Sequence, residues 1–128
     1  MALLLDTHAV LWNALDDARL SAAARMAIDQ ETERLYVSPA SFWELAIKIS
    51  HRRYTLTVPF QDFWEKALGV EGFTLLPIEI RHANRILALP QIHRDPFDRM
   101  LIAQALADNL RLISNESLFD QYNVQRIW

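Results

Sequence analysis

Short apolar runs alternate along this chain with segments whose apolar residues recur at the spacing of an α-helix. Strands are expected at five runs: Leu3–Leu5, Leu35–Val37, Phe73–Leu76, Leu110–Ser114 and Val124–Ile127. Helices are expected at about 9–15, 21–30, 39–51, 60–68, 79–87 and 96–108, with a helical turn near 117–119. This alternation is typical of an α/β fold with a parallel sheet built by right-handed crossovers. We expect a single domain over residues 1–128 because no repeat, low-complexity segment or linker divides the chain.

Three expected helices begin with recognisable capping residues. Ser21 is a suitable N-cap, and Ser38 is followed by Pro39, a residue favoured at the first helical position. Asp95 and Pro96 repeat this pattern before the long apolar segment that ends near Asp108. The boundaries of all the elements are expected to within a few residues.

Composition removes several classes of function. The chain is 52% apolar, which suits a real core, but no stretch reaches the roughly 20 apolar residues of a membrane span. With no cysteine, disulfides and thiolate chemistry are excluded, and a reducing cytoplasm is the expected location. The first residues lack a basic leader and a cleavage site, so no secretion signal is expected. Gly69 and Gly72 are the only glycines and neither follows a strand into a helix, so no nucleotide cofactor is expected.

Acidic side chains follow the expected strands. Asp6 comes directly after the first strand, and Glu44 lies nearly two turns into the helix that leaves the second. Asp98 is in the first turn of the long helix, Asp95 precedes it by three residues, and Glu116 follows the fourth strand by two. Ligands of open parallel sheets bind beyond the carboxyl ends of the strands. The sequence therefore predicts that these carboxylates gather at one edge of the sheet.

Each acid also has a purely structural interpretation. Asp6 can cap the following helix, and Glu44 can pair with Lys48 one turn later, a contact worth roughly 0.2–0.5 kcal/mol. The segment Asp95–Asp98 has the form of a helix cap, which explains Asp95 well and Asp98 in part. Glu116 can be an ordinary loop residue. These interpretations account for each residue separately but not for their shared position after strands.

Clustered carboxylates require a cation. Several of them within a few ångströms repel one another, and some would take up protons in order to coexist. An all-oxygen set without cysteine or paired histidines suits Mg²⁺ or Mn²⁺ rather than Zn²⁺. Such ions activate water and neutralise the charge that develops on a phosphodiester. With a net charge of −3, the protein would need such ions or local basic patches to approach RNA.

Three segments resemble the signature blocks of PIN-domain proteins, and more narrowly of VapC-type ribonuclease toxins. They are Leu3–His8, Ser38–Lys48 and His93–Ala105, and the third is the most distinctive. The resemblance runs over essentially the whole chain. It implies an α/β/α sandwich around a parallel sheet of four or five strands and RNA cleavage that depends on Mg²⁺ or Mn²⁺. It also implies a homodimer and a cognate antitoxin protein that inserts a segment into the site.

The resemblance also assigns the metal-binding carboxylates. Asp6, Glu44 and Asp98 match the acidic positions of the family. Glu116 stands where the family usually has an aspartate, and glutamate reaches about one methylene further. Asp95 is the alternative donor at this fourth position.

Neutral side chains beside the acids would support the site from outside the metal shell. The segment Ser114–Glu116 resembles the family's Thr-x-Asp pattern, with serine in place of threonine. Thr7 and Ser114 would orient a carboxylate or a metal-bound water. Asn115 is a further supporting residue, or a contributor in place of Glu116.

Basic residues near the predicted site are candidates for phosphate contacts. They are Lys48, Arg52 and Arg53 at the end of one helix, and Arg94 and Arg99 around Asp98. Arginine matches phosphate geometry bidentately. For Lys48, Arg52 and Arg53 the alternative is a solvated helix end with favourable dipole interactions.

The interpretation that follows is hydrolysis of RNA phosphodiesters by a metal-bound water. One alternative is a phosphatase with an aspartyl nucleophile. That chemistry usually has a second acid two residues after the first, where His8 stands here, and a late lysine, which is absent beyond Lys66. The other alternative is a non-catalytic RNA- or protein-binding module on the same fold, which the glutamate at position 116 keeps open.

Overall fold

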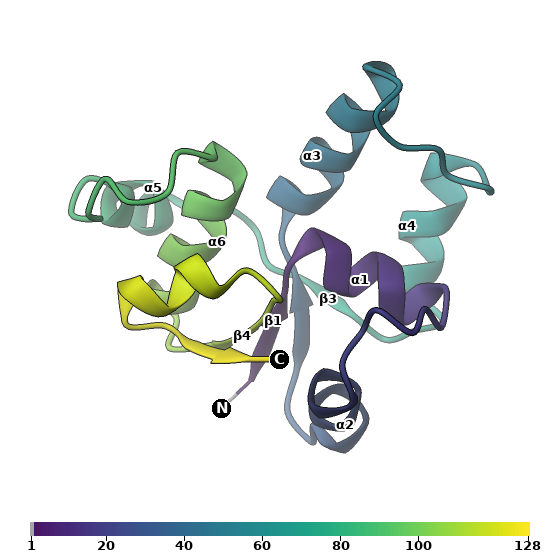
Figure 1. The fold of residues 1–128 in the computed structure, drawn as a ribbon, viewed down its shortest axis with the longest axis horizontal. Coiled ribbons are helices and arrows are strands. Elements are labelled where there is room, and N and C mark those ends of the chain that lie inside the picture. Colours follow the sequence, from purple (N-terminus) through teal and green to yellow (C-terminus); the bar gives the residue numbers. More distant parts are fainter. Residues whose placement is uncertain (1) are drawn as a thin grey trace.

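A five-stranded parallel sheet forms the middle of the molecule (Figure 1). The computed structural model describes residues 2–128; Met1, the first residue of the predicted domain, lies outside them. The strands are β1 (Leu3–Leu5), β2 (Leu35–Val37), β3 (Thr74–Leu75), β4 (Arg111–Ile113) and β5 (Gln125–Ile127). Their order across the sheet is β3-β2-β1-β4-β5, and every neighbouring pair is parallel. The expected α/β class and parallel sheet are confirmed.

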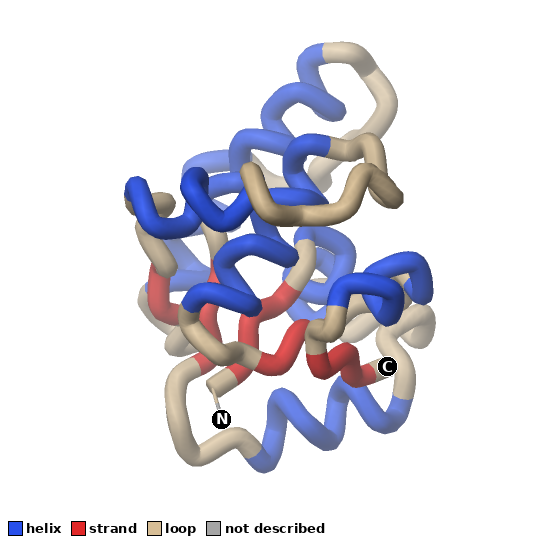
Figure 2. The backbone as a smooth tube through the Cα atoms, turned by 90° about the vertical axis from the view of Figure 1, so that its left-hand side faces the viewer, coloured by secondary structure: helices blue, strands red, loops and turns tan. Residues whose placement is uncertain are grey.

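Helices cover both faces of the sheet (Figures 1 and 2). They are α1 (Thr7–Ala14), α2 (Ala22–Gln30), α3 (Pro39–Ser50), α4 (Phe60–Leu68), α5 (Ile80–Ile86), α6 (Pro96–Ala107) and the 3₁₀ helix η1 (Ser117–Tyr122). Successive residues of a strand point to opposite faces. Leu3 and Leu5 therefore join the core under α1–α4, while Leu4 joins the core under α5, α6 and η1. The result is a three-layer α/β/α arrangement.

The expected caps are present. Ser21 accepts a hydrogen bond from the Ala24 N–H, and Ser38 from the Ala40 N–H. Asp95 accepts from the N–H groups of residues 97 and 98 at the start of α6. These bonds satisfy N–H groups that have no partner within the helix. They explain why the starts of these three helices were predictable.

Element ends differ from the expectations by one to three residues. Helix α1 begins at Thr7 rather than near residue 9, because Asp6 already caps it. The last helical turn extends to Tyr122, beyond the expected residue 119. The strands β3, β4 and β5 are each shorter than the apolar runs that predicted them. Within the described part of the chain, no helix has the length and apolar content needed to span a bilayer.

Candidate acidic site

A polar pocket opens at the carboxyl end of the sheet. Parallel register aligns Leu5, the last residue of β1, with the last residues of β2 and β4 on either side. The chain therefore leaves three neighbouring strands at the same edge. A cavity of about 310 Å³ lies there, lined by Asp6, Thr7, His8, Trp12, Glu44, Lys48, Asp95, Asp98, Asn115 and Glu116. All five acids expected from the sequence line this one cavity.

Asp6 lies near the centre of this edge because β1 is the middle strand of the sheet. Its carboxylate accepts a hydrogen bond of 2.8 Å from the Ala9 N–H, so it also caps α1. The hydroxyl of Ser114, at the end of β4, is a second partner. Asp6 is only 6% exposed. Burial raises its pKa above the ordinary value, although both hydrogen bonds oppose this effect.

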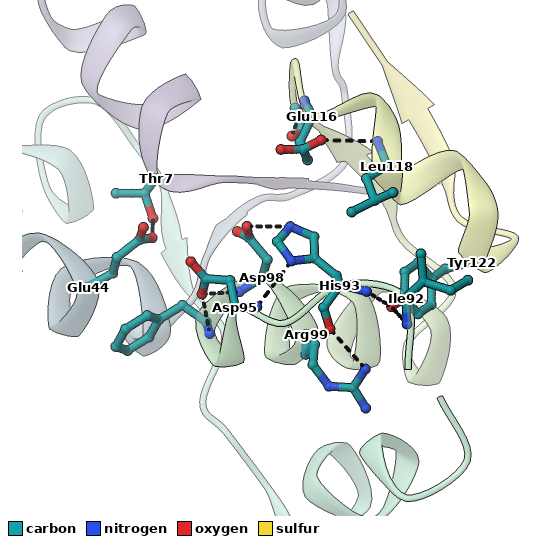
Figure 3. A network of polar contacts seen from close by, with 12 residues as sticks. Thr7, Glu44, Ile92, His93, Asp95, Asp98, Arg99, Glu116, Leu118 and Tyr122 are labelled. Atoms are coloured by element: carbon teal, nitrogen blue, oxygen red, sulfur yellow. Dashed lines mark hydrogen bonds and ion pairs between the residues drawn. The ribbon is translucent and has the colours of Figure 1, made fainter. Parts of the chain in front are cut away.

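Glu44 projects from α3 and is held by two side chains. Thr7 donates from Oγ1 to Glu44 Oε1 at 2.7 Å (Figure 3). On the other oxygen, Lys48 Nζ lies 2.8 Å from Oε2. The ion pair is the one-turn contact expected from the sequence. It does not draw Glu44 away from the pocket, since Lys48 lines the same cavity. The helical ion pair and the acidic cluster are therefore both present.

Asp98 is a second acid whose pKa the pocket raises. Its pKa is raised from 3.8 to about 8, first by burial and then by the negative charges of Asp95, Glu44, Asp6 and Glu116. Its Oδ2 lies 2.9 Å from Nε2 of His93. A carboxylate in such surroundings ionises easily only if positive charge comes close to it.

Glu116 and its neighbours form the side of the pocket that follows β4. Glu116 Oε1 accepts from the Leu118 N–H at 3.1 Å and caps η1 (Figure 3). Its own N–H donates to Ser114 Oγ at 3.0 Å. Ser114 is fully buried and so connects this loop to Asp6, while the exposed Asn115 lines the pocket.

Unlike the acids, the basic residues expected at the site do not all lie in the pocket. Lys48 lies in the pocket, whereas Arg52 and Arg53 are exposed beyond the end of α3 and Arg94 is exposed in the loop before α6. Arg99 is buried, and its Nη1 donates to the carbonyl oxygens of Pro90 at 2.9 Å and His93 at 3.4 Å. These bonds turn the Arg99 guanidinium into the fold. The expectation of a phosphate contact from Arg99 therefore does not fit its position.

Three residues near the acids were not expected. His8 and Trp12 line the pocket from α1, with ring centroids 5.2 Å apart. Their four-residue spacing was the available signal, since residues i and i+4 share a helix face. His93 contacts Asp98 from an irregular loop, for which the sequence carries no comparable periodicity.

The donor set fits a hard divalent cation by its chemistry. Carboxylate oxygens from five acids surround the pocket, and Mg²⁺ and Mn²⁺ prefer oxygen donors. Among residues 2–128, however, no three acidic or histidine side chains are already arranged to hold an ion. The carboxylates are instead turned to helix N–H groups, Thr7 and Lys48. Side-chain rotations would be needed to bring them onto a common cation.

Comparison with known proteins gives a family match and a related sequence. The sequence model of the PIN domain matches residues 3–125. Ribonuclease VapC22 of Mycobacterium tuberculosis is 33% identical over 114 residues, which cover 88% of this chain and 85% of that protein.

Solved structures show the same fold. VapBC2 from Rickettsia felis, bound to a DNA fragment from its promoter, superimposes with a TM-score of 0.72 at 12% identity and covers 100% of both chains. A toxin–antitoxin complex from Klebsiella pneumoniae gives a TM-score of 0.59 at 19% identity, with 90% of this chain and 87% of that chain covered.

Proposed function

The chain belongs to the PIN-domain family, and from this premise we propose that it is a ribonuclease that hydrolyses RNA phosphodiesters with the help of Mg²⁺ or Mn²⁺. The observation that carries the proposal is the gathering of Asp6, Glu44, Asp98 and Glu116, four acids distant in sequence, around one pocket. The relative named a ribonuclease supports RNA as the substrate.

The four carboxylates would hold the cation, with Asp95 as a further donor. A bound divalent ion supplies an activated water and neutralises charge that develops on the phosphate. Thr7 fixes one oxygen of Glu44, and Ser114 holds Asp6 while it supports the loop of Glu116. These hydroxyl groups would orient the carboxylates beside a bound cation.

The phosphate backbone would be bound by the cationic groups on the pocket side. Lys48 lies 2.8 Å from Glu44 and can turn toward a phosphate when a cation takes its place at the carboxylate. Arg94 is exposed one residue before Asp95, and Arg52 and Arg53 would meet RNA beyond the end of α3. Arg99 is not included, because its guanidinium is buried.

We further propose that the protein is the toxin of a toxin–antitoxin module and acts as a homodimer. Support for the toxin–antitoxin assignment comes from the solved structures that share its fold, which include VapBC2 and a toxin–antitoxin complex. The homodimer is what the family resemblance implies. An antitoxin that inserts a segment into the pocket would block both cation and RNA. A basic side chain from that segment would find five carboxylates in place of the metal ion.

The test is cleavage of a mixed cellular RNA pool by purified protein freed of any antitoxin. We expect cleavage with Mg²⁺ or Mn²⁺, none with EDTA, and a loss of at least about 100-fold in Asp98→Asn, in line with the cost of losing key electrostatic groups. Asp29→Asn is the matched control, because Asp29 is an exposed aspartate on α2, away from the pocket. Binding of RNA without cleavage under every metal condition would instead identify a non-catalytic binding module.

A further inference from the structure

A histidine outside the set of acids touches one of them. His93 lies in the loop between α5 and α6, and its Nε2 approaches Asp98 Oδ2 at 2.9 Å (Figure 3). Both side chains are largely shielded from solvent, with 13% of His93 and 22% of Asp98 exposed. We propose that His93 is a positioning residue that fixes the Asp98 carboxylate for cation binding. This inference rests on the proposed metal-dependent function.

The hydrogen bonds of His93 define its tautomer. Nδ1 accepts from the Asp95 backbone N–H at 3.1 Å, so this nitrogen carries no proton. The ring proton is therefore on Nε2, the atom that faces Asp98. Nε2 is buried and makes no well-aligned hydrogen bond within residues 2–128, so the carboxylate at 2.9 Å is its polar partner. Orientation of a carboxylate by an imidazole N–H is a common arrangement around metal ligands.

The backbone on both sides of the ring is held in place. The Tyr122 hydroxyl accepts from the N–H groups of Ile92 at 3.2 Å and His93 at 2.6 Å, and it donates to the Pro90 carbonyl at 3.1 Å. Arg99 donates to the carbonyls of Pro90 and His93. The loop is thus tied to η1 and α6 by two buried side chains. His93 is presented by a rigid support, which positioning requires.

The contact is not needed to start helix α6. Asp95 already caps the helix by accepting from the N–H groups of Phe97 at 2.8 Å and Asp98 at 3.2 Å. Asp98 therefore gains no capping role from its approach to His93. Its carboxylate instead stands among like charges, where an N–H donor on one oxygen leaves the other for a cation. The geometry thus favours a role in the acidic site over a role in helix stability.

Two amide substitutions at position 93 test the contacts of the two ring nitrogens separately. In His93→Asn the short amide can replace Nδ1 toward the Asp95 N–H but cannot reach Asp98. In His93→Gln the longer amide can place an N–H near the position of Nε2. Loss of a residue that orients a metal ligand typically weakens metal binding by roughly 10–100-fold. We therefore expect Mn²⁺ affinity to fall by that factor in His93→Asn and to stay within about threefold of wild type in His93→Gln.

The experiment is isothermal titration of EDTA-stripped protein with Mn²⁺, with the melting temperature of each variant measured in parallel. His51→Gln is the control, because His51 is exposed at the end of α3 and outside the pocket. The expected order of affinity is wild type and His51→Gln, then His93→Gln, then His93→Asn. If His93→Asn binds as tightly as wild type, or if His93→Gln loses as much affinity, the positioning role is wrong. If wild-type protein binds no Mn²⁺, the proposed metal-dependent function itself fails, and the role of His93 fails with it.

Discussion

The pocket makes ionisation of the Asp98 carboxyl unfavourable. Its pKa of about 8 lies far above the ordinary value of 3.8, because the carboxyl is buried and four other acids surround it. Between these two pH values the unfolded chain has released this proton and the folded protein has kept it. Ionisation of Asp98 therefore costs folding free energy, and its effect on stability becomes more unfavourable as pH rises from about 4 to about 8.

Asp98→Asn is expected to stabilise the protein in the absence of metal. An amide cannot ionise, so the cost of the buried charge disappears, and the gain should grow between pH 5 and pH 8. We expect on the order of 1 kcal/mol or more at pH 8, a rise in melting temperature of roughly 3–5 °C in EDTA. Thermal denaturation at both pH values measures it, with Asp29→Asn as the control. A variant that melts at or below the wild-type temperature at pH 8 would show that Asp98 is not under electrostatic strain.

Single residues also show what could be predicted from sequence. Contacts between residues close in sequence could be predicted from spacing. They are the helix caps at Asp6 and Asp95 and the ion pair of Glu44 with Lys48, and all three are present. The roles of His93 and Arg99 depend on how an irregular loop folds against η1. No local periodicity encodes that arrangement, so the sequence predicts a phosphate contact for Arg99 and no role for His93.

Helix α3 carries both a serine N-cap and the pocket residue Glu44. Ser38 is fully buried between β2 and α3, and its side chain accepts from the Ala40 N–H at 3.1 Å. The cap fixes where α3 leaves the sheet, and thereby where Glu44 stands nearly two turns later. A disturbed cap should therefore affect both stability and the pocket.

Ser38→Ala and Ser21→Ala form a matched pair of cap deletions. Each removes one serine cap and should cost about 0.5–2 kcal/mol, seen as a lower melting temperature. Of the two helices α2 and α3, only α3 carries pocket residues, so only Ser38→Ala should also weaken Mn²⁺ binding, by several-fold. Thermal melts and Mn²⁺ titrations of both variants test this. Equal Mn²⁺ affinity in the two variants would mean that the cap does not position Glu44.

The elements were predictable in kind and number, but their ends less so. Five strands and six helices follow from apolar periodicity, because a strand buried on both faces needs a continuous apolar run such as Leu3–Leu5. Phe73 precedes β3 and Leu110 precedes β4; both belong to the core, but their N–H groups donate to the carbonyls of Ala67 and Ala105 rather than to a neighbouring strand. Residues such as Phe73 and Leu110 therefore lengthened the predicted strands.

The arrangement of the whole sheet decides which acids meet. The order β3-β2-β1-β4-β5 places Asp6 between the ends of β2 and β4, and so between Glu44 and Glu116. Sequence pattern predicts a parallel sheet, whereas the strand order depends on long-range packing. Arg52 lies away from the pocket, because the six residues of α3 from Glu44 to Ser50 already span about 9 Å and Arg52 follows the end of the helix. The sheet edge shared by the acids was thus predictable from sequence. Which basic residues lie in the pocket was not.

A cation that binds only the folded protein should stabilise the entire domain. At a Mn²⁺ concentration about 100 times the dissociation constant, the expected gain is ~2.7 kcal/mol. We expect a corresponding rise in melting temperature at pH 7.5 for wild type and Asp29→Asn. The double variant Glu44→Gln/Asp98→Asn should show little or no rise. A shift of equal size in the double variant would place the bound ion elsewhere on the protein.

The most direct test of a divalent-cation site is the anomalous difference map of a crystal grown with Mn²⁺. We predict a peak in the pocket, within coordination distance of carboxyl oxygens from Asp6, Glu44 and Asp98, with Glu116 or Asp95 close by. We also predict that no such peak is present in Asp98→Asn crystals grown under the same conditions. A peak only at some other surface, in a protein that still cleaves RNA with Mn²⁺, would contradict the assignment of this pocket as the catalytic site.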